Sequence, residues 1–440
     1  MILKSRNRPA VWMALGLAAT IVACDKDTIP TDVTESANLA PAVSAGKGQF
    51  EDFTPIPASA ACVAPPPTVA GFATYQPFVL PAGYTQTILA TELEDFAPAA
   101  GTSGDVPDML TLNETGPQAG RYLYRTHEVG ANGAVTATDL RTGVTSLVDK
   151  QSHYEALDGI VWTPWHTLLF AEERIVASFK DPRVPNAVGG LVYEYNPRTG
   201  QTTPRPAVGA RSHEGLRFDA QGNLYGISES TPGANGSGAL YKFVPDRRGD
   251  LSSGQLYALK VLNPSRTGEA VWVPLDRDQV QVNSDAAAIA AGATGWGRPE
   301  DLEISTSGGN TKGGNVMYAT STSEDLVLRI ELNGDEAFVS NFVQEGVNVS
   351  GLNNPDNLTL DNQGNVYISE DNGPGDIFLA RVSGGNERVA GEVVLFASLS
   401  DCQGEPTGLY FDRNSKTAWV HVQHAGGVLR NDLLVAIAKN

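Results

Sequence analysis

The chain has 440 residues, of which 50 are acidic and 31 basic, so its formal net charge at pH 7 is −19. A surface this acidic repels nucleic acid and anionic lipid, and both partner classes are excluded. An anionic substrate would be repelled as well, unless bound cations reverse the sign of the charge locally.

Residues 1–23 have the pattern of a signal peptide. Three cations precede an apolar run over residues 10–23, and the run is too short to span a membrane comfortably. It stops at Cys24 in a pattern typical of bacterial lipoproteins, which are cleaved before the cysteine and acylated there. We therefore expect a lipid anchor on Cys24 and an exported protein at the periplasmic or outer face of the cell envelope. The alternative is an ordinary secretory leader in which Cys24 is incidental.

Residues 24–67 are expected to form a flexible tether. They are rich in Thr, Ser, Ala and Pro and show no hydrophobic period, which is typical of a linker. A single folded domain is then expected over residues 68–440. Cys62 and Cys402 remain as an even pair in an oxidising compartment, so we expect a disulfide between them. Two separately buried thiols are the alternative.

Two segments of this domain are near copies of each other. Residues 217–230 and 359–371 each read as a strand, a tight turn with Asp and Gly-Asn, and a second strand that ends in an acid. Looser copies end at Glu128, Glu173, Asp325 and His424. Six such units, with 46 Gly, 27 Pro and little helical periodicity, predict an all-β fold, a six-bladed β-propeller.

The acids at the ends of these strands form the candidate site. In a propeller the innermost strands line the central channel, so acids at equivalent strand ends would meet at the axis. A single acid in such a position is more often a solvated surface residue. Several carboxylates at one channel mouth repel one another, and hard cations such as calcium would relieve that repulsion. The acids concerned are Glu128, Asp158, Glu172, Glu173, Glu214, Glu229, Glu300, Asp356, Glu370, Asp371 and Glu405.

Seven segments resemble, in the same order, segments of the PhoX-type bacterial alkaline phosphatases. They cover residues 125–130, 163–173, 211–219, 238–261, 297–304, 353–373 and 405–424. The resemblance implies a six-bladed propeller that hydrolyses phosphate monoesters with calcium and oxo-bridged iron at its axis. It also implies Arg298 as the cation that holds a phosphate oxygen, with Glu300 beside it in the catalytic centre. The metal ligands that it implies are Glu128, Glu173, Glu214, Glu300, Asp356, Glu370 and Glu405.

Two positions depart from the family pattern. Asp158 stands where the family usually has a cysteine that binds iron, and as an added oxygen ligand it favours calcium or magnesium over iron. His166 replaces a glycine, either as a packed histidine or as an extra metal ligand. His127 and His213 each precede a candidate glutamate, and strand alternation directs them away from it. We expect both to support the site rather than to bind metal.

The function expected is metal-dependent hydrolysis of a small phosphate monoester by a monomeric protein anchored to a membrane. Cations would neutralise the phosphoryl oxygens, and no side-chain nucleophile would be needed. Two other classes stay open. Residues 355–367 also resemble a motif of gluconolactonase-type propellers, lactonases that depend on one calcium ion. The second alternative is a non-catalytic propeller that binds calcium or a partner.

Overall fold

A computed structural model describes residues 50–66, 69–72, 74–91, 106–176, 178–233, 236–305, 316–382, 388–412, 414–427 and 432–440. The expected signal peptide and Cys24 lie outside these residues. Helical structure in the described part is limited to α1 (Val69–Phe72), α3 (Arg277–Ala291) and the 3-10 turns η1 (Pro206–Val208), η2 (Thr322–Glu324) and η3 (Ala425–Gly427). None of these helices is long and apolar enough to cross a membrane.

The strands form five antiparallel sheets, of which four have four or five strands each. The first contains β3 (Pro107–Leu112), β4 (Tyr122–His127), β5 (Ala134–Asp139) and β6 (Val144–Lys150). The second contains β7 (Leu157–Trp162), β8 (Leu168–Glu172), β9 (Val192–Asn196) and β10 (Gln201–Pro204). Another contains β20 (Pro355–Leu360), β21 (Val366–Glu370), β22 (Asp376–Arg381), β23 (Glu392–Leu399) and β1 (Phe78–Val79). A further sheet contains β24 (Glu405–Phe411), β25 (Thr417–Gln423), β26 (Leu433–Lys439) and β2 (Tyr84–Thr91).

The remaining sheet has nine strands and joins two meanders at their outer edges. One meander runs through β11 (His213–Phe218), β12 (Leu224–Ser228), β13 (Leu240–Arg247), β14 (Asp250–Val261) and β15 (Gly268–Pro274). The other runs through β16 (Leu302–Ser305), β17 (Val316–Ser321), β18 (Leu326–Asn333) and β19 (Glu336–Gln344). Pairing of β15 with β19 connects them.

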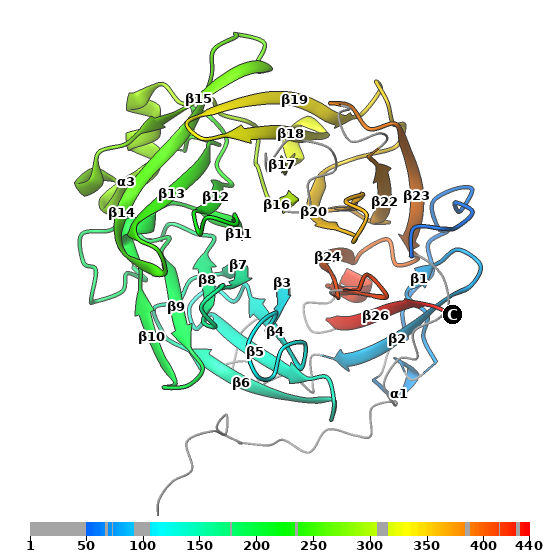
Figure 1. Ribbon diagram of the computed structural model, residues 1–440. Coiled ribbons are helices and arrows are strands. Elements are labelled where there is room, and N and C mark those ends of the chain that lie inside the picture. Colours follow the sequence, from blue (N-terminus) through cyan, green and yellow to red (C-terminus); the bar gives the residue numbers. More distant parts are fainter. Residues whose placement is uncertain are drawn as a thin grey trace, which may run out of the picture.

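The sheets are arranged in a ring, with β3, β7, β11, β16, β20 and β24 innermost (Figure 1). Each of these inner strands contacts the next one around the ring, and β24 contacts β3. This arrangement confirms the predicted all-β, propeller-like fold. The division into six separate blades stays a prediction, because the nine-stranded sheet is continuous.

The hydrophobic core lies between neighbouring sheets rather than at the axis. One cluster joins the last two sheets through Tyr367, Phe396 and Phe411, all buried. Neighbouring sheets pack face to face, and the apolar side chains on their facing sides exclude water from the space between them. The axis is therefore left free for polar side chains.

Two links close the ring. The N-terminal strand β2 pairs with the C-terminal strand β26 from Tyr84↔Lys439 to Thr91↔Leu433. A disulfide joins Cys62 to Cys402, with the two Cα atoms 5.3 Å apart and a sequence separation of 340 residues. The first and last segments of the domain are thereby held together.

The segment from Phe50 to residue 66, part of the expected tether, makes contacts with the sheets. Phe50 is buried and packs edge-on against the rings of Tyr84 and Phe411. The Val63 amide donates to the Ser400 carbonyl at 2.7 Å. These apolar and backbone contacts fix the segment from Phe50 onward to the sheet surface.

Candidate metal centre

Four inner strands carry an acid at the same position, close to the axis, and in a fifth repeat the equivalent acid, Glu300, lies two residues before β16 begins. In the first four a register irregularity accompanies the acid: Pro107/Leu110, Leu157/Ile160, His213/Leu216 and Pro355/Leu358. A β-bulge re-aims the side chain of the extra residue, and here it directs the acid toward the channel. We call all five the inner-strand acids, namely Asp108, Asp158, Glu214, Glu300 and Asp356, and Thr407 holds the sixth position.

Glycine after the acid allows neighbouring inner strands to approach closely. A Cβ atom at Gly159 would overlap the carbonyl group of Glu214 on the next strand. A Cβ at Gly215 would overlap the backbone and carboxylate of Asp301. The glycine in each Asp-Gly or Glu-Gly pair therefore permits the close approach that brings acids of adjacent repeats to a common centre.

A second set of acids follows the second strand of four repeats. The backbone N–H of each donates to the carbonyl two residues before the inner-strand acid, which places the two carboxylates of one repeat side by side. That carbonyl belongs to a left-handed residue in three of the repeats, Val106, Ala156 and Asn354. The donor–acceptor pairs are Glu128–Val106 at 2.9 Å, Glu173–Ala156 at 2.8 Å, Glu229–Ser212 at 3.2 Å and Asp371–Asn354 at 2.9 Å.

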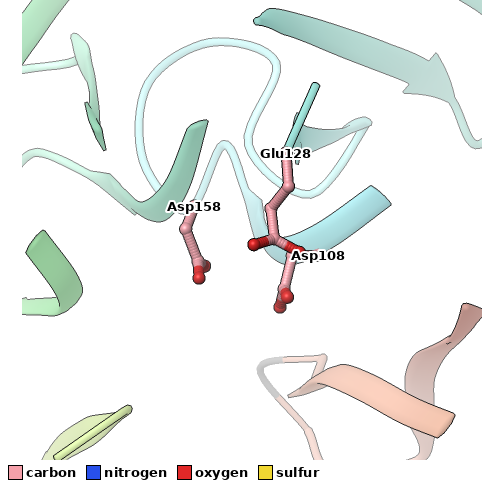
Figure 2. Close-up of side chains that lie close together, drawn as sticks. All are labelled: Asp108, Glu128 and Asp158. Atoms are coloured by element: carbon pink, nitrogen blue, oxygen red, sulfur yellow. The ribbon is translucent and has the colours of Figure 1, made fainter. Parts of the chain in front are cut away.

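Two groups of three carboxylates result from this geometry. Asp108, Glu128 and Asp158 offer oxygen atoms within 4.8 Å of one another, and Figure 2 shows their carboxylates converging on one space from separate segments. Glu173, Glu214 and Glu229 form the second group at the same spacing. We call them the first and the second carboxylate group.

Several of these carboxylates lie in surroundings that disfavour their charge. Burial raises the pKa of Asp158 well above its ordinary value, and repulsion from Glu128 adds to the effect. Burial also raises the pKa of Glu214, with further repulsion from Asp158 and Glu300. The pKa values of Asp108, Glu173, Glu300 and Asp356 rise for the same two reasons, burial first.

Bound cations fit this donor set. Asp158 Oδ1 and Glu214 Oε1 are buried and have no hydrogen-bond partner among the described residues. Buried polar atoms normally have a partner, and orphaned ones indicate a place for an ion or a water molecule. Every atom in the two groups is a carboxylate oxygen, the ligand that hard divalent cations prefer.

Arg298 lies at the edge of the cluster and is the cation closest to these acids in the described part. Its Nη2 is 2.8 Å from Glu300 Oε1, its Nε is 3.0 Å from Glu229 Oε1, and its Nη1 is 3.9 Å from Asp371 Oδ2. The side chain is 41% exposed, so one edge of the guanidinium faces solvent. Arg298 has a left-handed backbone, with φ of 47°, at the position equivalent to Val106, Ala156 and Asn354.

The structure brings together Glu128, Asp158, Glu173, Glu214, Glu300, Asp356 and Glu405, but not Glu370. The Glu370 carboxylate instead accepts backbone N–H groups from Asn353 at 2.6 Å and Asp376 at 3.1 Å. Burial raises its pKa to about 8. The next residue, Asp371, has its charge near Glu300 and Glu405. Glu172 likewise holds a loop, accepting from the Leu191 amide at 2.9 Å.

Three residues of the site were missed in the sequence. Asp108 belongs to the first carboxylate group, and its segment 107–113 (PDMLTLN) closely matches residues 355–361 (PDNLTLD), a similarity that could have identified it. Gln423 Nε2 donates to Glu128 Oε2 at 3.0 Å and to Asp108 Oδ2 at 3.2 Å. Thr407 also donates to Asp108. Neutral side chains from the last repeat thus support the first carboxylate group.

The histidines do not enter the carboxylate groups. His127 Nε2 lies 2.8 Å from Thr136 Oγ1, and His213 Nε2 lies 2.9 Å from the Gly209 carbonyl. Burial, together with the charge of Arg211, holds the pKa of His213 well below its ordinary value. His166 lies in the β7–β8 turn, at the opposite end of β7 from Asp158, and contacts Thr115 Oγ1 at 2.8 Å. It is therefore an exposed turn residue, neither packed in the core nor placed to bind a cation at this centre.

A separate cavity of about 410 Å³ occupies the opposite end of the channel. Its floor contains the ion pair between Arg217 and Glu303, whose closest atoms are 2.7 Å apart. Thr111, Thr359 and Tyr410 line it as well. These residues come three positions after the inner-strand acid or its equivalent, so the cavity and the carboxylate groups lie at different ends of the same strands.

Comparisons with known proteins agree on this architecture. The family model described as alkaline phosphatase PhoX matches residues 159–426. Pseudomonas fluorescens PhoX, solved in complex with vanadate, a transition state analogue, has a TM-score of 0.63 at 16% identity over 88% of this chain and 98% of that one. At that identity the likeness shows the fold.

Two other solved structures are less similar. A gluconolactonase from Xanthomonas campestris has a TM-score of 0.46 at 13% identity, covering 89% of this chain and 100% of its own. A putative phosphatase from Bacteroides thetaiotaomicron has a TM-score of 0.46 at 12% identity, covering 76% and 72%. No curated protein matches the chain by sequence.

Proposed function

The chain belongs to the PhoX alkaline phosphatase family, and from that membership we propose that it hydrolyses phosphate monoesters outside the cytoplasm with calcium as its cofactor. One observation carries the proposal beyond family membership: carboxylates from separate repeats, most of them buried, gather beside one half-exposed arginine. We also infer that the ring has six blades, on the support of its six inner strands.

Calcium would be held by the two carboxylate groups. The first group would contribute Asp108, Glu128 and Asp158, and the second would contribute Glu173, Glu214 and Glu229. When bound, divalent cations neutralise phosphoryl oxygens and thereby supply electrostatic catalysis. The donor set favours calcium over iron, because Asp158 offers a hard oxygen where the family usually has a thiolate.

Arg298 would bind the phosphoryl group of the substrate. Its guanidinium is fixed by Glu229 and Glu300, and its exposed edge keeps donors for planar, two-pronged contact with phosphate oxygens. Glu300 would keep the guanidinium oriented as charge develops on the phosphoryl oxygens. With cations and Arg298 providing the positive charge, a strongly acidic chain can accept an anionic substrate.

The location outside the cytoplasm has support from two features. The disulfide between Cys62 and Cys402 is typical of proteins in oxidising compartments. The lipoprotein-like pattern up to Cys24 supports a membrane anchor at the cell envelope. We propose a monomer anchored in this way, acting on small phosphorylated molecules.

The test is release of p-nitrophenol from p-nitrophenyl phosphate. Wild-type protein is assayed after EDTA treatment, after addition of calcium, and after addition of calcium with iron. We expect turnover with calcium that falls at least about 100-fold in Arg298→Ala, the usual cost of removing a donor to a charged transition state. Arg247→Ala is the matched control, because Arg247 is 81% exposed, lies at the end of β13 and pairs with Asp250 outside the site.

Equal background rates under all conditions and in all variants would remove the phosphatase assignment. Hydrolysis of a lactone with one bound calcium per chain, and none of the phosphate ester, would favour the lactonase class instead. Stoichiometric iron with no activity on calcium alone would overturn the choice of cofactor. Elemental analysis of the same preparation supplies both metal counts.

A further inference from the structure

Helix α3, inserted between β15 and β16, is interrupted at one residue. Asn283 has extended backbone angles (φ −159°, ψ 99°) inside the helix. Its Oδ1 accepts the backbone N–H of Ala286 at 2.9 Å, so the helix restarts with a cap after the interruption. The interruption directs Ser284 and Asp285 into the protein, where both side chains are fully buried.

The Asp285 carboxylate accepts four hydroxyl groups. Ser237 Oγ and Tyr241 OH donate to Oδ1 at 2.6 and 2.7 Å. Ser228 Oγ and Ser230 Oγ donate to Oδ2 at 3.0 and 3.4 Å. A buried carboxylate is tolerated only with such saturation of its lone pairs. The two oxygens thus have different sets of partners. The two partners of Oδ2, Ser228 and Ser230, lie on either side of Glu229 in the sequence.

A buried cation completes the network. The Arg211 guanidinium lies 4.2 Å from the centre of the Tyr241 ring. It donates from Nε to the Ile227 carbonyl and from Nη1 to the Val208 carbonyl, both at 3.0 Å. The backbone just before Glu229 and the side chains on either side of it are therefore anchored to buried charges. Glu229 itself extends to the second carboxylate group and to Arg298.

We propose that Asp285 is a positioning residue for the second carboxylate group, acting through Ser228 and Ser230 to hold Glu229 in place for a bound cation. The inference rests on the proposed function only in taking that group as a cation site. Residues that orient metal ligands typically change metal affinity by about 10–100-fold when altered. The insertion that contains α3 would accordingly help to position the metal ligands, in addition to packing on the outside of the ring.

The test compares two single-hydroxyl deletions around the same carboxylate. Ser228→Ala removes a partner of Oδ2 beside Glu229, whereas Ser237→Ala removes a partner of Oδ1 away from it. Calcium binding to EDTA-treated protein is measured by isothermal titration calorimetry, and terbium luminescence reports the same sites spectroscopically. We expect one class of calcium sites to weaken by about tenfold or more in Ser228→Ala and in Asp285→Asn. In Ser237→Ala that affinity should stay within about twofold of wild type, although unfolding temperatures fall in both alanine variants.

Equal weakening in Ser228→Ala and Ser237→Ala would reduce Asp285 to a purely structural role and overturn the inference. Wild-type calcium affinity in Ser228→Ala would overturn it as well. Both of these results leave the proposed function standing, since the wild type still binds calcium. A wild type that binds no calcium or terbium would overturn the proposed function, and this inference with it.

Discussion

Replacing Glu405 by Gln should stabilise the cation-free protein, by an amount that grows with pH. Burial raises the pKa of Glu405 from 4.5 to about 9, with further contributions from Asp371, Glu128 and Asp432. The folded protein therefore keeps a proton that the unfolded chain releases above pH 4.5, and stability is lost as the pH rises toward 9. At pH 7 the interval is about 2.5 pH units, which corresponds to about 3 kcal/mol. Glutamine has no proton to release, so the variant escapes this loss.

The assay is thermal unfolding of EDTA-treated wild type and Glu405→Gln from about pH 4.5 to about pH 8, the interval over which the unfolded carboxyl has lost its proton and the folded one retains it. The two unfolding temperatures should coincide at the acid end and separate progressively in favour of the variant. Glu336→Gln, at an exposed position of β19, is the control and should parallel the wild type. Excess calcium should narrow the difference, because a cation held by the neighbouring carboxylate groups favours the charged form of Glu405. A pH-independent difference, or a variant less stable at every pH without calcium, would refute the reasoning.

Three further predictions follow from the ring and its charges. Removing calcium with EDTA should lower the unfolding temperature at pH 7, since calcium at about 100 times its Kd adds about 2.7 kcal/mol; an unchanged temperature in differential scanning fluorimetry would argue against a bound cation. Gly159→Ala should lower both the unfolding temperature and the calcium affinity, because its Cβ would overlap the Glu214 carbonyl. Gly200 has open space around it, so Gly200→Ala should leave the calcium affinity as in wild type. Equal calcium affinities in the two variants would contradict the argument from close approach. The double variant Cys62→Ser with Cys402→Ser should lose at most about 6 kcal/mol of unfolding free energy, the loop-entropy value for cysteines 340 residues apart, and no loss on denaturant titration would show that the N-terminal segment is held by its other contacts.

The fold could be predicted because its signals are local. An Asp followed by Gly-Asn between two strands specifies a hairpin, and residues 217–230 and 359–371 repeat it almost letter for letter. In both turns the Asp accepts the backbone N–H two and four residues later, as Asp219 does at 3.0 and 2.8 Å. The joining of β15 to β19 across two repeats depends on long outer strands, for which no comparable local signal exists.

The acids of the candidate site could be predicted only where the sequence showed clearly at which residue a strand ends. Glu370 and Asp371 are adjacent acids, and which of them faces the axis depends on the bulge at Pro355/Leu358, which shifts the register by one residue. Asp108 escaped notice because the turn after β3 has no Gly-Asn signal. Phe50 and Cys62 bind an otherwise linker-like segment to the ring, and composition averaged over that segment conceals such single anchors.

The pairing of β2 with β26 sets the order of events when the protein folds. Tyr84 meets Lys439, so β2, which is synthesised early, must wait for almost the whole chain before it finds its neighbour. Contacts so distant in sequence form slowly. Until then β2 and β25 each present an unpaired edge, the kind of surface on which chains aggregate. Folding of this protein should therefore be sensitive to chaperones, and truncation before residue 433 should leave an open ring with unpaired strand edges.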